Sequence, residues 1–183
     1  MLGLKRCICK VTEPVKFKTA IPLFAILVLA GCAETPARKV VPAQRLSLSQ
    51  VTLEPDAARR MINGYRSERG LGPLTLEKHL TRAARQHAQD LAKTDRVSHT
   101  GSDGSDPWGR VKVTGYKPKL AAENVGAGQM SFAEVLQGWK DSPGHNRNLL
   151  LADATHMGIA LVTNPLARYR TYWTLVLGKP ARS

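Results

Sequence analysis

Residues 138–150 read GWKDSPGHNRNLL. Trp139 is the last apolar position of a helical repeat that begins upstream, where Ser131 and the glutamate three residues later have the spacing of a capping box. A proline-glycine pair at 143–144 interrupts the repeat, because proline lacks a backbone N–H and glycine favours turns. The stretch therefore predicts a helix over 131–141, followed by a break and a short second helical piece.

The rest of the chain extends this pattern in both directions. Upstream, apolar residues recur at helical spacing over 55–70 and 76–94, and Pro107 can open a short helix. Downstream, 157–163 and 169–177 are short apolar or alternating runs that predict a terminal antiparallel hairpin. Helices first and strands last favour an α+β domain. Three tryptophans are expected to lie in its core: Trp108, Trp139 and Trp173.

Three polar positions at the edges of these elements could carry chemistry. They are His99, in a loop rich in Gly, Ser and Asp, Glu123, and His145, directly after the proline-glycine break. Zinc commonly binds imidazole nitrogen and carboxylate oxygen, so these residues could converge on a divalent cation. They could equally form hydrogen bonds that hold loops together, and the spacing does not decide between the two. Of the other histidines, His79 is expected to be solvated and His156 to start a strand.

Four ordered motifs resemble those of the CAP superfamily, which groups cysteine-rich secretory proteins, venom-allergen antigens and plant pathogenesis-related class one proteins. The motifs are SHTGSDG (98–104), AENVGAG (122–128), the stretch 138–150 and MGIA (157–160). The likeness covers roughly residues 54–178 and is greatest to the bacterial branch. It implies a three-layer α-β-α sandwich.

The resemblance also implies a cleft in which two histidines and two glutamates meet, where some members bind zinc or another divalent cation. His99, Glu123 and His145 match three of those four positions. The fourth position, a glutamate in animal and plant members, is Ser142 here, with Asp141 beside it. Three protein ligands and a water would suit an open metal site, although the missing carboxylate lowers the expected affinity.

The N-terminal part has the layout of a signal peptide. Basic residues precede an uncharged apolar run over 20–30, whose helix of about 16 Å is too short to cross a hydrocarbon layer of roughly 30 Å. The ending Leu-Ala-Gly-Cys resembles the lipobox of bacterial lipoproteins, which implies acylation of Cys32. The expected organisation is a leader over 1–31, a lipid-anchored flexible tether over 32–53 and a folded domain over 54–179.

A lipid on Cys32 would anchor the protein to a membrane of the cell envelope, outside the cytoplasm. In a host with two membranes, Ala33 in place of Asp after the acylated cysteine predicts the periplasmic face of the outer membrane. Removing the leader lowers the formal net charge from +13 to +9, which favours anionic lipids or wall polymers as partners. This compartment excludes nucleic acid, and we expect a monomer. Cys7 and Cys9 lie in the leader, so a domain acylated at Cys32 would have no free thiol.

These observations leave three functions open. The first is an envelope binding module for a lipid, a wall fragment or a protein, with a divalent cation in the cleft as an option. The second is a metal-dependent hydrolase that uses Glu123 as its general acid or base. The third is a structural hydrogen-bond cluster of histidines and Glu123 that stiffens the cleft. Ser142 and His145 could be drawn as a nucleophile and its base, but nothing in the sequence places an oxyanion hole.

Overall fold

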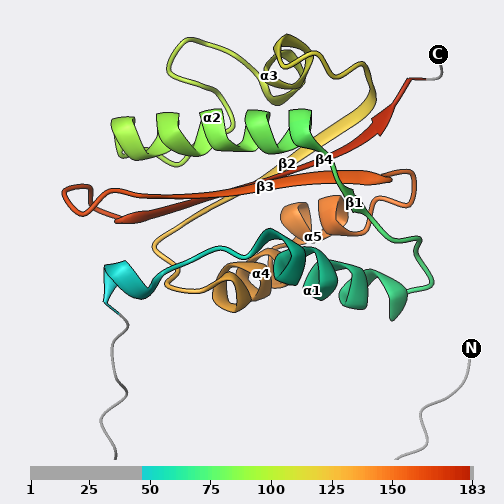
Figure 1. Ribbon diagram of the computed structural model, residues 1–183, viewed down its shortest axis with the longest axis horizontal. Helices are drawn as coiled ribbons and strands as arrows, with labels where there is room; N and C mark the ends of the chain where they lie inside the picture. The colour runs from blue at the N-terminus through green and yellow to red at the C-terminus, as the bar shows by residue number, and fades with distance from the viewer. Residues whose placement is uncertain (1–46, 182–183) are drawn as a thin grey trace, which may run out of the picture. The chain divides into compact units, whose positions relative to one another are not determined.

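A four-stranded mixed sheet lies between two layers of helices in the computed structural model, which describes residues 47–181 (Figure 1). The strands are β1 (Thr75–Leu76), β2 (Pro118–Ala127), β3 (His156–Thr163) and β4 (Thr171–Pro180). A short 3-10 helix, η1 (Leu48–Gln50), precedes the helices α1 (Pro55–Ser67), α2 (Lys78–Thr94), α3 (Pro107–Val113), α4 (Phe132–Asp141) and α5 (Pro143–Leu149). The expected three-layer α-β-α sandwich is confirmed.

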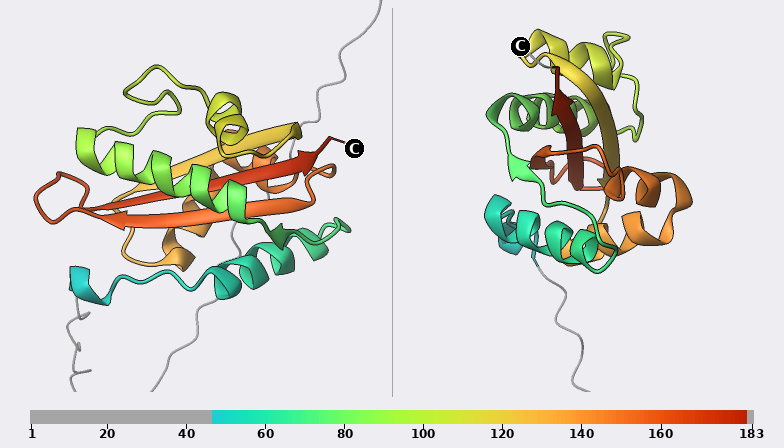
Figure 2. Two further views of the ribbon diagram at one scale, coloured as in Figure 1. Left: turned by 45° about the horizontal axis from the view of Figure 1, so that its top comes forward. Right: turned by 90° about the vertical axis from the view of Figure 1, so that its right-hand side faces the viewer.

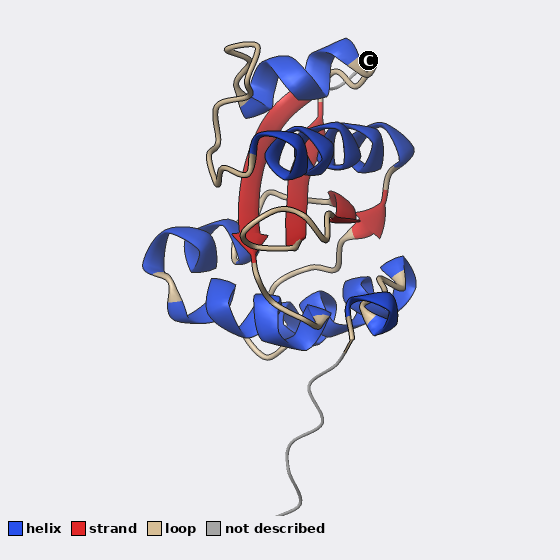
Figure 3. Ribbon diagram, turned by 90° about the vertical axis from the view of Figure 1, so that its left-hand side faces the viewer, coloured by secondary structure: helices blue, strands red, loops and turns tan. Residues whose placement is uncertain are grey.

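The strand order across the sheet is β1-β3-β4-β2. β4 is antiparallel to both of its neighbours, and the short β1 runs parallel to β3. Helices α2 and α3 cover one face of the sheet, whereas α1, α4 and α5 cover the other (Figures 1 and 2). Viewed from the side, the sheet separates the two helical layers (Figure 3). β2 is thus an edge strand next to both layers.

The central strand β4 is buried on both faces, and its side chains alternate between the two helical layers as the period of a strand requires. Trp173, Leu175 and Leu177 belong to the core under α1, α4 and α5. Val176 belongs to the core under α2 and α3. The expected hairpin is confirmed by the antiparallel pairing of β3 with β4, in which Met157 pairs with Leu177.

Helix α2 has clear signals at both ends. The Glu77 carboxylate accepts a hydrogen bond of 2.8 Å from the backbone N–H of Leu80, which caps the first turn. The helix ends at Thr94 and is followed by the C-cap Asp95, whose φ of 51° is left-handed. Its apolar side, including Leu80 and Leu91, is fully buried, as the helical repeat predicts.

Three details of the sequence prediction were wrong. The ten-residue strand β2 was not expected, because its alanines and polar residues show no alternation. Leu76 belongs to β1 and not to the helix that follows it. Trp108 is 41% exposed and lies outside the core, whereas Trp139 and Trp173 are buried as predicted.

The folded unit begins earlier than residue 54. Val51 is buried, and Leu48 and Leu53 pack against the core, so this part of the predicted tether belongs to the domain. The predicted leader, the acylation site Cys32 and most of the tether lie outside the described residues. Within residues 47–181, none of the helices combines the length and the apolar character needed to cross a membrane.

Candidate functional site

The candidate residues gather at the β2 edge of the sheet, where the two helical layers approach each other. Neighbouring side chains of a strand point to opposite faces. Glu123 therefore faces the α2 and α3 layer, where it contacts Arg110. Asn124 faces α5, where its amide contacts the backbone of His145. The pair at 123–124 thus links both layers to one strand.

Glu123 is almost fully buried, with 1% of its side chain exposed. Arg110 Nη2 donates to both of its carboxylate oxygens, at 3.0 Å and 2.8 Å. His99 Nδ1 lies 2.9 Å from the carboxylate oxygen Oε1. A buried carboxylate requires paired charge and hydrogen-bond donors, and Glu123 has both.

Arg110 reaches Glu123 from the short helix α3. The helix begins at Pro107, and the Asp106 carboxylate caps it by accepting from the backbone N–H of Gly109 at 2.6 Å. The Arg110 guanidinium also donates to the carbonyl oxygens of His99 and Ser105, both at 2.8 Å. Arg110 therefore fixes the loop that carries His99 as well as the carboxylate that His99 contacts.

His99 combines a fixed orientation with solvent exposure. Because an ionised carboxylate only accepts hydrogen bonds, Nδ1 of His99 must carry the proton that it shares with Glu123. In the tautomer with its proton on Nδ1, the lone pair lies on Nε2, which has no hydrogen-bond partner among the described residues. The His99 side chain is 51% exposed. An oriented hydrogen-bond acceptor is thus available at the surface.

His145 approaches His99 from the opposite helical layer. The centroids of the two rings are 6.2 Å apart. Asn124 Nδ2 donates to the carbonyl oxygen of His145 at 3.0 Å, and Asn148 Nδ2 donates to Asn124 Oδ1 at 2.9 Å. Burial, together with the neighbouring His99, lowers the pKa of His145. The structure thus brings His99, Glu123 and His145 together, as the sequence suggested.

A third histidine lies behind His99. His87 of α2 is buried, and its Nε2 donates to the carbonyl oxygen of Ser98 at 2.8 Å. The same Nε2 lies 3.5 Å from Glu123 Oε1. Burial lowers the pKa of His87, an effect that the charge of Glu123 partly opposes. His87 is therefore a neutral donor that supports the loop before His99.

The other two predicted cleft residues do not join this cluster. Asp141 is exposed and accepts a hydrogen bond from Gln137 Nε2 at 2.8 Å. Ser142 is the residue between α4 and α5, and no hydrogen bond links it to His145 within the described part of the chain.

The arrangement does not fit a metal site. The lone pairs that Glu123 would offer to a cation already accept hydrogen bonds from the guanidinium of Arg110. Within residues 47–181, no three His, Cys, Asp or Glu side chains are placed to hold a metal ion together. Two imidazoles fall short of the three or four protein ligands that zinc requires. The expected zinc or other divalent cation is therefore not supported by this geometry.

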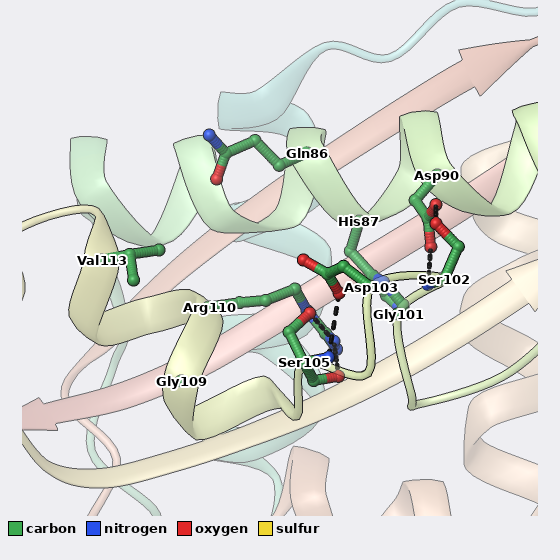
Figure 4. A pocket seen from close by; sticks show the side chains of 10 residues that line it. All are labelled: Gln86, His87, Asp90, Gly101, Ser102, Asp103, Ser105, Gly109, Arg110 and Val113. Atoms are coloured by element: carbon green, nitrogen blue, oxygen red, sulfur yellow. Dashed lines mark hydrogen bonds between the residues drawn. The ribbon is translucent and has the colours of Figure 1, made fainter.

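A cavity of about 430 Å³ lies beside the cluster, between α2, the loop around Gly101 and α3. Figure 4 shows His87 and Arg110 reaching it from α2 and α3, respectively. The backbone N–H of Ser102 in the loop donates to the Asp90 carboxylate of α2 at 2.8 Å. The volume lies within the range of pockets that hold small molecules.

Sequence reasoning did not single out Arg110, Asn148 or a role for His87 beyond burial. The sequence around Arg110 contains one usable signal. Arg110 stands directly before the apolar Val111 in a seven-residue helix, and a charge so close to the buried side needs a partner. Asn148 gave none, since an asparagine in a short polar helix is commonplace at surfaces.

Comparisons with known proteins agree with this fold. The model of the cysteine-rich secretory protein family, CAP, matches residues 59–177. The uncharacterized protein YkwD of Bacillus subtilis is 29% identical over 160 residues, which are 84% of this chain and 62% of YkwD. The chain thus spans less than two thirds of that relative.

Two solved structures of bacterial proteins share the architecture. An outer surface protein of Borrelia burgdorferi superposes with a TM-score of 0.63 at 21% identity, over 69% of this chain and 92% of that one. An extracellular SCP-domain protein of Bacillus anthracis superposes with a TM-score of 0.58 at 24% identity, over 70% of this chain and 44% of that one. These likenesses show a shared fold.

Proposed function

This chain belongs to the cysteine-rich secretory protein (CAP) family, and from this membership and the geometry of the cleft we propose that it is an extracytoplasmic binding module. Its ligand contacts the surface formed by His99 and His145. The solved relatives named as outer-surface and extracellular proteins support a location outside the cytoplasm. A lipid on Cys32 would hold the domain at a membrane.

The observation that carries the proposal is the presentation of His99. Its Nδ1 is fixed by a buried carboxylate at 2.9 Å, while half of its side chain remains exposed. A group held in one orientation loses little conformational entropy when it binds a ligand. The free Nε2 accepts a hydrogen bond, so the ligand carries a hydroxyl or amide donor at this point.

The same geometry disfavours the hydrolase. A general base must reach the proton that it removes, whereas Glu123 is 1% exposed and both of its oxygens are engaged by Arg110. Glu123 thus acts as the support for His99. The purely structural alternative, a hydrogen-bond cluster that stiffens the cleft, uses Nδ1 of His99 and gives no role to the exposed half of the ring.

The experiment is a thermal-shift titration of the chain from Ala33 onward, which retains all described core residues. Two defined probes are used: soluble peptidoglycan fragments, and vesicles of phosphatidylglycerol in phosphatidylethanolamine. The site variant is His99→Gln, and the control is His79→Gln, which changes a histidine on α2 outside the cleft. Each probe is recovered and checked for cleavage by mass spectrometry.

Each outcome decides between the functions. A saturable rise in Tm with an intact probe, lost in His99→Gln and kept in His79→Gln, supports the binding module. Cleavage that Glu123→Gln abolishes would establish a hydrolase. If neither probe raises Tm and His99→Gln destabilises the fold as strongly as loss of Arg110, the cluster is structural and the proposal is wrong.

A further inference from the structure

Trp108 is the exposed tryptophan of this chain, and it borders a second cavity. The chain has three tryptophans, of which Trp139 and Trp173 are at most 2% exposed, whereas Trp108 is 41% exposed. The cavity has a volume of about 390 Å³ and is formed by α3, the turn before β2 and the end of β4. It lies on the other side of α3 from the cavity that contains Arg110 and His87.

The indole is presented on a rigid element. Asp106 caps the start of α3, and the next residues on its inner side, Arg110 and Val111, are buried against the sheet. Arg110 is also held by its ion pair with Glu123. Helix α3 therefore has little freedom to turn Trp108 into the core, and exposure of the indole is a property of the folded domain.

Positive charge lines the same cavity. Lys112 lies one helical turn after Trp108, and Lys117 lies in the turn before β2; both are exposed. Neither ammonium forms a salt bridge with a described residue.

Two carboxylates lie near the cavity, and both already have partners. Asp106 accepts from the backbone N–H of Gly109. Glu77, whose charge acts on Tyr116, accepts from the backbone N–H of Leu80. An anion in this cavity would meet two cations without displacing an internal partner.

We propose that this cavity binds a saccharide that carries a carboxylate or phosphate group. The C–H groups on one face of a pyranose ring pack against the electron-rich face of an indole. The two lysines then attract the anionic substituent, and Tyr116 and Pro118 close the apolar floor. The volume is in the range of small-molecule sites. The proposal shares the extracytoplasmic location with the proposed function but does not use the His99 surface.

The concave shape favours a saccharide over a membrane surface. A side chain that anchors a protein in the headgroup region must project beyond its neighbours. Trp108 instead forms a wall of the cavity together with Lys112, Tyr116 and Ala181. The cavity is open to solvent, so a sugar ring can stack on the indole, and the vesicle arm of the test below separates this from a bilayer contact.

The test uses Trp108 as its own reporter. Because the other two tryptophans are buried, quenching by iodide reports on Trp108, and a ligand over the indole protects it. The chain from Ala33 onward is titrated with N-acetylmuramic acid and with N-acetylglucosamine 6-phosphate. N-acetylglucosamine is the neutral control, since it shares the ring and lacks the anionic group. Comparing the two anionic probes shows whether a carboxylate or a phosphate is preferred.

The expected result is saturable protection by at least one anionic sugar, with affinity about tenfold weaker for the neutral sugar. Lys112→Gln with Lys117→Gln reduces the affinity for the anionic sugar to that of the neutral one. Lys119→Gln, the same charge change on a lysine that does not line the cavity, has no effect. Trp108→Ala abolishes binding followed by saturation-transfer NMR on the sugar, with an unchanged Tm.

Three results would overturn the proposal. They are equal affinity for neutral and anionic sugars, full binding by the Trp108→Ala variant, and protection of Trp108 by phosphatidylglycerol vesicles with no protection by any sugar. The last result would assign the cavity to a membrane contact. If none of these sugars binds and the His99-dependent binding is retained, the proposed function remains intact.

Discussion

Arg110 Nη2 donates to both carboxylate oxygens of Glu123, at 3.0 Å and 2.8 Å, and thereby joins helix α3 to strand β2 inside the domain. Only 8% of the arginine side chain and 1% of the glutamate side chain are exposed. The same nitrogen donates to the carbonyl oxygen of His99. One guanidinium thus organises the sheet edge, the short helix and the loop that presents the exposed imidazole.

Replacing Arg110 by methionine should destabilise the domain by about 3–5 kcal/mol, because it leaves the Glu123 charge buried without a partner. Urea denaturation followed by circular dichroism measures the loss. The matched variant Arg110→Met with Glu123→Gln removes the charge as well and should recover a large part of it. If the single variant costs less than about 1 kcal/mol, Glu123 is not held as a buried anion.

His99→Gln should cost only about 1 kcal/mol, much less than Arg110→Met. The Glu123 carboxylate keeps both hydrogen bonds from Arg110, and the lost ring is half exposed, so no buried group is orphaned. Denaturation of the two variants side by side gives the comparison. A cost for His99→Gln that equals that of Arg110→Met would move His99 into the structural core of the cluster.

Much of this fold could be predicted from the sequence, because its helices bury one face and expose the other. Ser131 caps α4 through the N–H of Glu134, as its spacing indicated. β2 could not be predicted, since Glu123 and Asn124 occupy buried strand positions where apolar residues are the rule. Their burial depends on partners at 110 and 148, and such long-range pairing leaves no periodic signal.

The candidate site was predictable in its exposed part and not in its support. His99, Glu123 and His145 are chemically conspicuous, and the fold brings them together. Asn148 contributes through hydrogen bonds to Glu123 and Asn124, which are distant in the sequence and leave no local pattern. The place of Arg110 beside Val111 indicates a buried partner but does not identify Glu123. Trp108 was predicted to lie in the core, because an indole is usually buried. It is exposed because α3 buries Arg110 and Val111 on its other side.

Acidification should weaken the fold below pH 6.5 through the buried His87 and the half-buried His145. Burial lowers the pKa of His87 and of His145 in the folded state, whereas the unfolded chain titrates near 6.5. The unfolded state therefore binds more protons than the folded state as the pH falls. The contribution of these histidines to stability is full above pH 6.5, decreases below it and stops changing beneath their folded-state pKa values. The slope from fully buried His87 approaches about 1.4 kcal/mol per pH unit.

Denaturation between pH 7.5 and 5 measures this slope, and it should become shallower in His87→Gln and in His145→Asn. Four aspartates have a lowered pKa in the fold, so they change its stability in a separate range, below about pH 4. They are Asp90, Asp95, Asp103 and Asp153. A pH slope that is unchanged in both variants would show that His87 and His145 do not take up protons on unfolding.

Gly158→Ala and Gly138→Ala should shift stability in opposite directions, although each adds one methyl group. At Gly158 of β3, a Cβ would lie 2.1 Å from backbone atoms of Leu80 and Thr81, because α2 packs directly on the strand. Backbone cannot rotate away as a side chain can, so we expect a loss of about 3 kcal/mol or more. At Gly138, on the exposed side of α4, nothing lies within 4 Å of the added atom, and the better helix propensity of alanine should stabilise by about 0.5–1 kcal/mol. Urea denaturation of both variants measures the difference. Equal effects of the two changes would mean that α2 does not approach β3 this closely.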